Sequence, residues 1–324
     1  MSKLITRFRE LYHASNQQNF VEIAKRIGVS RTTLYSLFND DWKQIQRETI
    51  EKVCDFFHCD VSELFEIQEE PFWTSVKTVG EVCFIFGGTL AGKEEKSYIG
   101  QWDIKVMHSF TEHLNRMSGK QRINIFSKTS LEFGKDPQTI IDFIKTHNTI
   151  IVGSPKANRL TEIVLAKLYG AEPFNPSSDN REKIPYRFVR PQEWGESKLE
   201  SAVSEVGANG KLRGIFSQKS NQVIAFSEYF DDFFNRRIEH GRDCGLLVVV
   251  NRPFGTTVDV KTIILAGYTG LGSYGMAQLL LKERNNLEPR TSKPLERVAQ
   301  FAFKKMSPDI DDREVTKTTF VQEK

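Results

Sequence analysis

Apolar residues in the first 67 positions recur at helical spacing in five short segments, at residues 3–15, 21–27, 31–38, 47–57 and 60–67. Gly28 directly follows the second segment, where the left-handed end of a helix favours glycine. Ser30 precedes the third segment, as a residue that caps a helix N-terminus does. The pattern predicts a small helical domain in which two helices are joined by a tight turn.

The period changes after Pro71, which ends the helical pattern. Continuous apolar runs predict strands at residues 81–88, 121–126 and 149–155. The segments between and after them predict helices at residues 100–117, 136–147 and 157–169. Strands that alternate with helices indicate a parallel sheet covered on both faces.

Further strands are predicted at residues 184–189, 212–217, 222–227, 245–251 and 261–267. The middle ones follow one another without room for helices, so we expect antiparallel additions there. Helices are predicted at residues 271–283 and 294–304, and an aromatic helix for the core or a dimer contact at 226–237. The expected fold class is α/β, with a small all-α domain followed by a larger, mixed, mostly parallel α/β domain.

The domain boundaries follow from these changes of pattern. We expect a helix-turn-helix domain at residues 1–68, a linker at 69–78, a Rossmann-like domain at 79–310 and a loose, charged tail at 311–324.

Composition narrows the function classes. Hydrophobic residues make up 39% and charged residues 27% of 324, which is typical of a globular protein. No apolar run reaches the length of a membrane span, and the N-terminus has no secretory signal, so we predict a cytoplasmic protein without membrane contact. The four cysteines are scattered and the histidines dispersed, so neither a metal site nor a cofactor is predicted.

The distribution of charge is more informative than the total. Residues 1–47 contain eight Lys and Arg against four Asp and Glu, whereas residues 48–70 contain one Lys against eight Asp and Glu. A basic block followed by an acidic one suggests a domain with one face turned to an anion, unless the charges only cluster by chance on a solvated surface.

The two helices around Gly28 have the order of a helix-turn-helix, whose second helix enters the DNA major groove. With the apolar residues of 31–38 packed inward, the residues left outward carry donors and no carboxylate: Arg31, Thr32, Thr33, Tyr35 and Ser36. Arg can pair with guanine and Thr can contact a thymine methyl. Gln17, Gln18 and Asn19 lie before the bracing helix, where they could hold a phosphate. A plain helical hairpin, or a domain used for protein contacts, is the alternative.

Three stretches carry a family resemblance: FVEIAKRIGVSRTTLYSLFN, ETIEKVCDFF and DVSELFE. Residues 3–67 resemble the Cro/C1-type, lambda-repressor-like helix-turn-helix domain of the XRE family. The resemblance implies base reading by Ser30, Arg31, Thr32, Thr33 and Ser36, a phosphate contact by Lys43, a double-stranded operator and a homodimer or higher homo-oligomer. Many members have Gln before the bracing helix. Here Asn19 and Phe20 stand there, with Gln18 adjacent.

Three glycine-bearing turns follow predicted strands of the larger domain, and ligands bind at the carboxyl ends of such strands. The candidate ligand-binding residues are Gly87, Gly88, Thr89, Gly153, Ser154, Lys156, Asn158, Gly267, Thr269, Gly270, Gly272 and Ser273. Backbone N–H groups there could hold a nucleotide-like or phosphorylated effector. Neither GxGxxG nor a P-loop is present, so the glycines could equally serve tight turns and close packing.

These patterns favour a DNA-binding transcriptional regulator whose α/β domain senses a small molecule and dimerises. The alternative is a nucleotide- or NAD-processing enzyme, such as a defence effector, that uses the helix-turn-helix for targeting. Asp103, Glu162 and Asp243 flank strand ends and could serve acid–base chemistry, although no catalytic residue is assigned. An assembly protein, with no salt-dependent affinity for DNA, is a third possibility.

Overall fold

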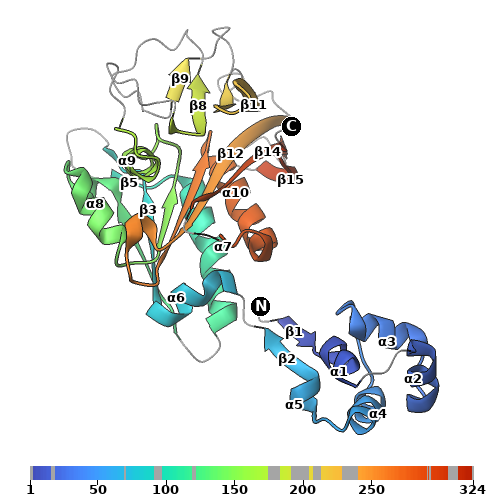
Figure 1. Cartoon of the computed structure of the whole chain (residues 1–324). Coiled ribbons are helices and arrows are strands. Elements are labelled where there is room, and N and C mark those ends of the chain that lie inside the picture. Colours follow the sequence, from blue (N-terminus) through green and yellow to red (C-terminus); the bar gives the residue numbers. More distant parts are fainter. Residues whose placement is uncertain are drawn as a thin grey trace. The chain divides into compact units, whose positions relative to one another are not determined.

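The computed structural model describes residues 3–15, 19–68, 71–90, 97–118, 122–173, 183–190, 204–206, 213–227, 240–289, 291, 293–305 and 313–322. The chain divides into two compact units, Met1–Glu70 and Pro71–Lys324 (Figure 1).

The small unit is a bundle of short helices beside a two-stranded ribbon. Its elements are β1 (Lys3–Thr6), α1 (Phe8–Ala14), α2 (Phe20–Ile27), α3 (Arg31–Phe38), α4 (Arg47–Phe57), α5 (Val61–Leu64) and β2 (Phe65–Gln68). Its core is formed by the apolar faces of all five helices, among them Phe8, Ile23, Leu34, Val53 and Leu64. An all-apolar interface of this kind is what the helical spacing predicts.

The helices predicted at residues 3–15 and 60–67 were both too long, because one end of each forms a strand. Residues 3–15 do not form one helix, because β1 precedes α1. The fifth helix ends at Leu64, and β2 follows it. The two strands pair antiparallel, with Lys3 opposite Gln68 and Thr6 opposite Phe65. A strand partner some 60 residues away cannot be read from local periodicity.

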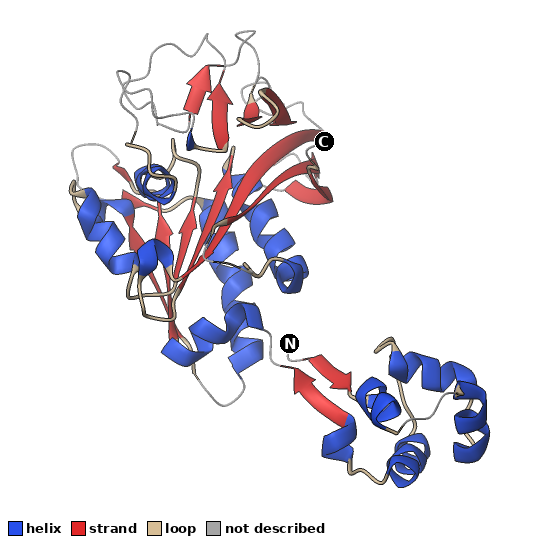
Figure 2. Cartoon of the chain, in the orientation of Figure 1, coloured by secondary structure: helices blue, strands red, loops and turns tan. Residues whose placement is uncertain are grey.

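The larger unit is built on a mixed sheet of seven strands, as the fold class predicts (Figure 2). The strand order is β15-β14-β12-β13-β7-β3-β6. Their bounds are β3 (Glu81–Phe86), β6 (Asn124–Thr129), β7 (Thr149–Val152), β12 (His240–Asn251), β13 (Lys261–Gly267), β14 (Leu295–Lys305) and β15 (Arg313–Phe320). The neighbouring strands β6, β3, β7 and β13 run parallel, and β12, β14 and β15 add antiparallel pairs.

Helices cover both faces of this sheet. On one face lie α6 (Thr74–Val79), α7 (Gln101–Ser118) and α10 (Gly270–Glu283), packed through Val76, Phe110 and Met276. On the other lie α8 (Pro137–Ile144) and α9 (Arg159–Leu168), with a second, smaller sheet. That sheet has the order β11-β10-β8-β9, with β8 (Tyr186–Arg190), β9 (Ser204–Val206), β10 (Gly214–Ser217) and β11 (Gln222–Phe226). Two short strands, β4 (Thr89–Leu90) and β5 (Ser97–Tyr98), pair with each other.

The C-terminal region differs from the sequence prediction. Residues 294–304, predicted as a helix, form β14 instead, because ten of its residues pair with β12. Arg313–Phe320, predicted as part of a loose tail, pairs with β14 as the end strand of the sheet. The predicted middle strands are confirmed as antiparallel pairs of the smaller sheet. Most of the aromatic helix predicted at 226–237 lies outside the described residues, which resume at His240.

Candidate functional site

The turn between α2 and α3 has the local chemistry that the sequence predicts. Gly28 has a φ of 69°, in the left-handed region, and its N–H donates to the carbonyl of Ala24. Ser30 caps α3, since its Oγ accepts the backbone N–H of Thr33 at 3.1 Å. The Ser30 and Thr33 hydroxyls also share a hydrogen bond of 2.8 Å. These contacts fix where α3 begins and therefore which side chains its first turn exposes.

The first turn of α3 is polar and open to solvent. Arg31 and Thr32 are exposed, Thr33 and Ser36 are half-buried, and Leu34 is buried. Within the described parts of the chain Arg31 makes no hydrogen bond or ion pair, so its guanidinium remains available to a partner. No carboxylate lies on α3. The face therefore presents donors and one positive charge, which suits guanine edges and phosphates.

The start of α2 and the loop after α3 border this face. Asn19 is exposed, but its side-chain Oδ1 caps α2 by accepting the N–H of Val21 at 2.9 Å, so only its amide nitrogen is left for a phosphate. Gln18 lies outside the described residues. Lys43 is exposed in the loop between α3 and α4 and has no partner among the residues described.

Comparison with known families gives an assignment for this unit. The family description of the Cro/C1-type HTH DNA-binding domain matches residues 7–70. Residues 7–70 are a Cro/C1-type HTH DNA-binding domain. No family is assigned to the C-terminal part, and no curated protein and no solved structure matches the chain.

One feature of the Cro/C1-type domain was missed by sequence reasoning. Phe20, the first residue of α2, stacks on Tyr35 of α3, with ring centroids 4.7 Å apart and planes only 6° from parallel. Phe20 also contacts Tyr12 of α1, with ring centroids 4.6 Å apart. The sequence did carry a signal, because Asn19 and Phe20 stand where many family members have Gln before the bracing helix. By itself this difference suggests only the loss of a polar contact, and the structure shows that Phe20 gains an aromatic one.

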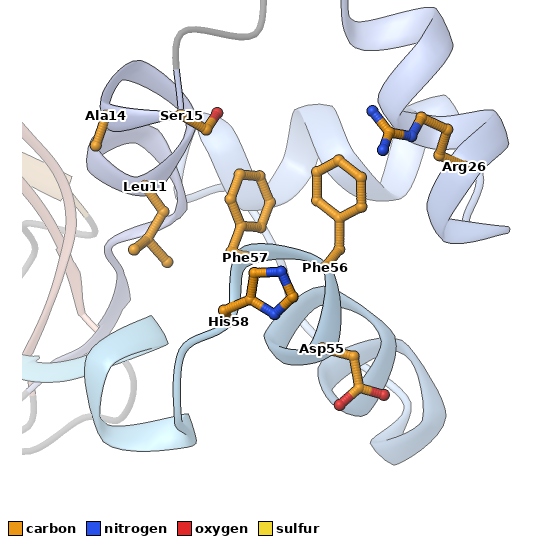
Figure 3. Close-up of a pocket in the computed structure, with 8 residues that line it drawn as sticks. All are labelled: Leu11, Ala14, Ser15, Arg26, Asp55, Phe56, Phe57 and His58. Atoms are coloured by element: carbon orange, nitrogen blue, oxygen red, sulfur yellow. The ribbon is translucent and has the colours of Figure 1, made fainter.

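The same domain has a pocket of about 580 Å³, separate from the first turn of α3 (Figure 3). It lies between α1, the end of α2 and the end of α4, and is lined by Leu11, Ala14, Ser15, Arg26, Asp55, Phe56, Phe57 and His58. The guanidinium of Arg26 lies 5.1 Å from the centre of the Phe56 ring. Arg26 is therefore held by a cation–π contact within its own domain, unlike Arg31.

In the larger unit, the three predicted turns leave the same edge of the sheet, because β3, β7 and β13 are parallel neighbours. Gly87 and Gly88 follow β3, Gly153 and Ser154 follow β7, and Gly267 ends β13. Thr89 begins β4. Lys156 is exposed in the loop before α9. The three turns therefore lie together, at the edge where α/β sheets bind ligands.

The turn after β7 is closely packed around Asn158. Its side-chain amide nitrogen donates to the carbonyls of Ile85 at 3.1 Å and Val152 at 2.9 Å, while its Oδ1 accepts the N–H of Leu160. Its side-chain nitrogen and oxygen are thus both engaged with β3, β7 and α9. A Cβ on Gly87 would lie 1.9 Å from the Ala157 carbonyl oxygen, so this glycine permits a close approach of two backbones.

The turn after β13 is organised by a buried carboxylate. Asp243 on β12 accepts the hydroxyl of Thr269 at 2.5 Å and the N–H of Cys244 at 2.9 Å. Thr269 caps α10. A Cβ on Gly272 would lie 2.8 Å from the Asp243 carboxylate. Burial raises the pKa of Asp243 to about 6.

The remaining residues of this turn also contact the protein. Ser273 accepts the N–H of Gly267 through its Oγ at 3.0 Å, and Gly270 abuts Trp102 at the start of α7. Each predicted ligand residue of this turn is therefore used in packing or hydrogen bonding, which is the alternative that the sequence left open for these glycines.

Of the other carboxylates, Asp103 is half-buried on the first turn of α7, and burial raises its pKa to about 6. Glu162 is half-buried on α9. Among the residues described there is no cluster of His, Cys, Asp and Glu that could hold a metal ion. None of the helices described combines the length and apolar character that crossing a bilayer requires.

Proposed function

We propose that this chain is a sequence-specific DNA-binding transcriptional regulator. Its Cro/C1-type domain binds a double-stranded operator through the first turn of α3. Its larger unit joins two copies, so that two recognition helices meet a palindromic site. Because its proposed partner is DNA, we also propose that the protein acts in the cytoplasm.

One observation carries this proposal. The exposed start of α3 has a free arginine and several hydroxyls and lacks carboxylates, while the apolar residues of the same helix are buried. Ser30, Arg31, Thr32, Thr33 and Ser36 are the proposed base-reading residues. Lys43, Asn19 and Gln18 are the proposed phosphate contacts. In a plain helical hairpin the outer surface can carry charges of either sign, so a face with donors and no carboxylate favours DNA binding over that alternative.

Replacing Arg31 tests the proposal. Arg31→Ala should weaken binding to the preferred operator by about 1–3 kcal/mol and relax sequence preference at one position. The operator is first selected from random duplexes with the wild-type chain, and affinities are then measured by fluorescence anisotropy over a range of salt concentrations.

Arg26→Ala is the matched control, since it removes the same charge from the same domain at a site held over Phe56. It should leave sequence preference unchanged. If wild-type protein binds no duplex with a salt-dependent affinity, DNA binding by this chain is refuted; if Arg31→Ala equals Arg26→Ala, only the assignment of Arg31 is lost.

We further propose that a small, nucleotide-like or phosphorylated effector acts at the edge formed by the turns after β3, β7 and β13. What supports this is the convergence of the three turns. Of the proposed residues there, Lys156 is exposed, and Gly87, Gly88, Thr269 and Gly270 are half-buried. An effector alters operator affinity only if it binds the two conformations of the dimer unequally.

Asp103 favours a second candidate function, a nucleotide-processing enzyme. A half-buried carboxyl with a pKa of about 6, at the edge of an α/β sheet, is suited to general acid–base catalysis near neutral pH. Incubation with nucleotides and NAD should then give turnover that Asp103→Asn abolishes and Asp136→Asn, an exposed carboxylate substitution, does not. Absence of turnover on these substrates removes this candidate.

A further inference from the structure

How the Cro/C1-type domain holds the DNA backbone can be inferred from one aromatic contact, provided that the proposed function holds. Tyr35 is an unusual residue on α3. It points outward with half of its surface exposed, at 50%, although aromatic side chains of this small domain otherwise pack into its core. A tyrosine ring that is held by stacking yet half-exposed has an apolar body fixed by the domain and a polar end open to a partner.

Phe20 holds that ring in place. The two rings are stacked at 4.7 Å with planes 6° apart, and Phe20 itself is held by Tyr12, at 4.6 Å, and by Phe38, at 5.1 Å. Phe20 is the first residue of α2, and Tyr35 lies one helical turn after Arg31 on α3. The stack thus spans the border between the bracing helix and the recognition helix.

This border is where a DNA backbone crosses a helix-turn-helix, since the first helix crosses the phosphates while the tip of the second reads bases. A tyrosine hydroxyl is a neutral donor that suits a phosphate oxygen. Holding the ring before binding also reduces the entropy lost when the contact forms. We propose that the Tyr35 hydroxyl donates a hydrogen bond to a DNA phosphate, and that Phe20 is the positioning residue that holds its ring in place.

The phosphate contact has a distinctive signature. Tyr35→Phe keeps the stack but removes the donor, so affinity should fall by roughly tenfold on operator and on unrelated duplex alike. Because a neutral donor releases no counterion, the slope of log affinity against log salt should stay as in wild type. Lys43→Ala, which removes a charge, should reduce that slope by about one.

The positioning role is tested by a double-mutant cycle with the full-length chain. Phe20→Leu retains apolar bulk but removes the stack, and it should weaken DNA binding in the wild-type background and have little effect in the Tyr35→Phe background. Tyr12→Phe is the matched control, because it removes a tyrosine hydroxyl from the same aromatic cluster but on α1, and it should bind as wild type. Thermal unfolding of each variant shows whether the domain remains folded.

The outcomes separate the two proposals. If wild type binds DNA and Tyr35→Phe binds equally well, the phosphate contact is overturned. If Tyr35→Phe loses affinity only for the operator, Tyr35 reads a base and the assignment to phosphate is overturned. If Phe20→Leu and Tyr35→Phe are additive, the positioning role is overturned. If wild type shows no salt-dependent affinity for any duplex, it is the proposed function that fails.

Discussion

Asn158→Ala should lower the free energy of unfolding of the larger unit by about 3–5 kcal/mol. Asn158 is fully buried and holds three elements together, because its amide nitrogen donates to carbonyls at the ends of β3 and β7 while its oxygen caps α9. Alanine leaves two buried carbonyls without this donor and removes the helix cap. Urea denaturation of the full-length chain measures the effect on the larger unit.

Asp136→Ala is a matched control, since Asp136 caps α8 through the N–H of Gln138 but is exposed and, among the residues described, bonds to no other element. Loss of a cap alone destabilises by about 1 kcal/mol. The excess in Asn158→Ala over Asp136→Ala therefore measures the two interior hydrogen bonds. Equal effects would show that Asn158 acts only as a cap and that its amide is free for a ligand.

The second large effect concerns pH and Asp243. In the folded chain burial raises the pKa of Asp243 to about 6, against 3.8 for an unperturbed aspartate, although Thr269, Cys244 and Gly272 donate to the carboxylate. The folded state therefore holds the proton more tightly than the unfolded state. The resulting stability is fully present below about pH 4 and is lost as pH rises to about 6, a change of about 3 kcal/mol.

Asp243→Asn removes this titration but also turns an acceptor into a donor in a site that supplies donors, so the variant should be less stable at every pH. Its deficit relative to wild type should be largest near pH 4 and should shrink by about 3 kcal/mol above pH 6. Urea midpoints at several pH values give both profiles.

Asp259→Asn, at an exposed aspartate paired with Arg252, should follow the wild-type profile. Parallel profiles for wild type and Asp243→Asn would mean that Asp243 titrates alike in the folded and unfolded chains, contrary to its burial between β12 and α10.

Local chemistry explains what could be predicted in the Cro/C1-type domain. Gly28 and Ser30 fix the turn and the cap through contacts within a few residues, so sequence spacing was sufficient to place Arg31 and Thr32 on an exposed first turn. The pairing of Phe20 with Tyr35 joins two helices and was not predictable, because it depends on how α2 packs against α3. The replacement of an expected polar residue by Asn19 and Phe20 was visible in the sequence, but the stacking of Phe20 on Tyr35 was not.

In the larger unit the parallel strands and their turns were predicted from buried apolar runs, since a strand covered on both faces is apolar along its length. Their glycines could serve a ligand or close packing, and sequence spacing could not choose between these. Some of the contacts around them join distant residues, since Asn158 bonds to Ile85, 73 residues away, and Asp243 to Thr269, 26 residues away.

The sequence by itself determined the helix-turn-helix, the change to an α/β sheet after Pro71 and the exposed donors of α3, because each depends on periodicity or on contacts between near neighbours. The tertiary structure alone decided that Leu295–Lys305 is a strand, that Arg313–Phe320 joins the sheet, and that β1 pairs with β2. The physical reason is that a strand forms only with a partner. The pairing of β1 with β2 joins the two ends of the small unit, and β15 extends the edge of the larger sheet, so local propensity does not predict either pairing.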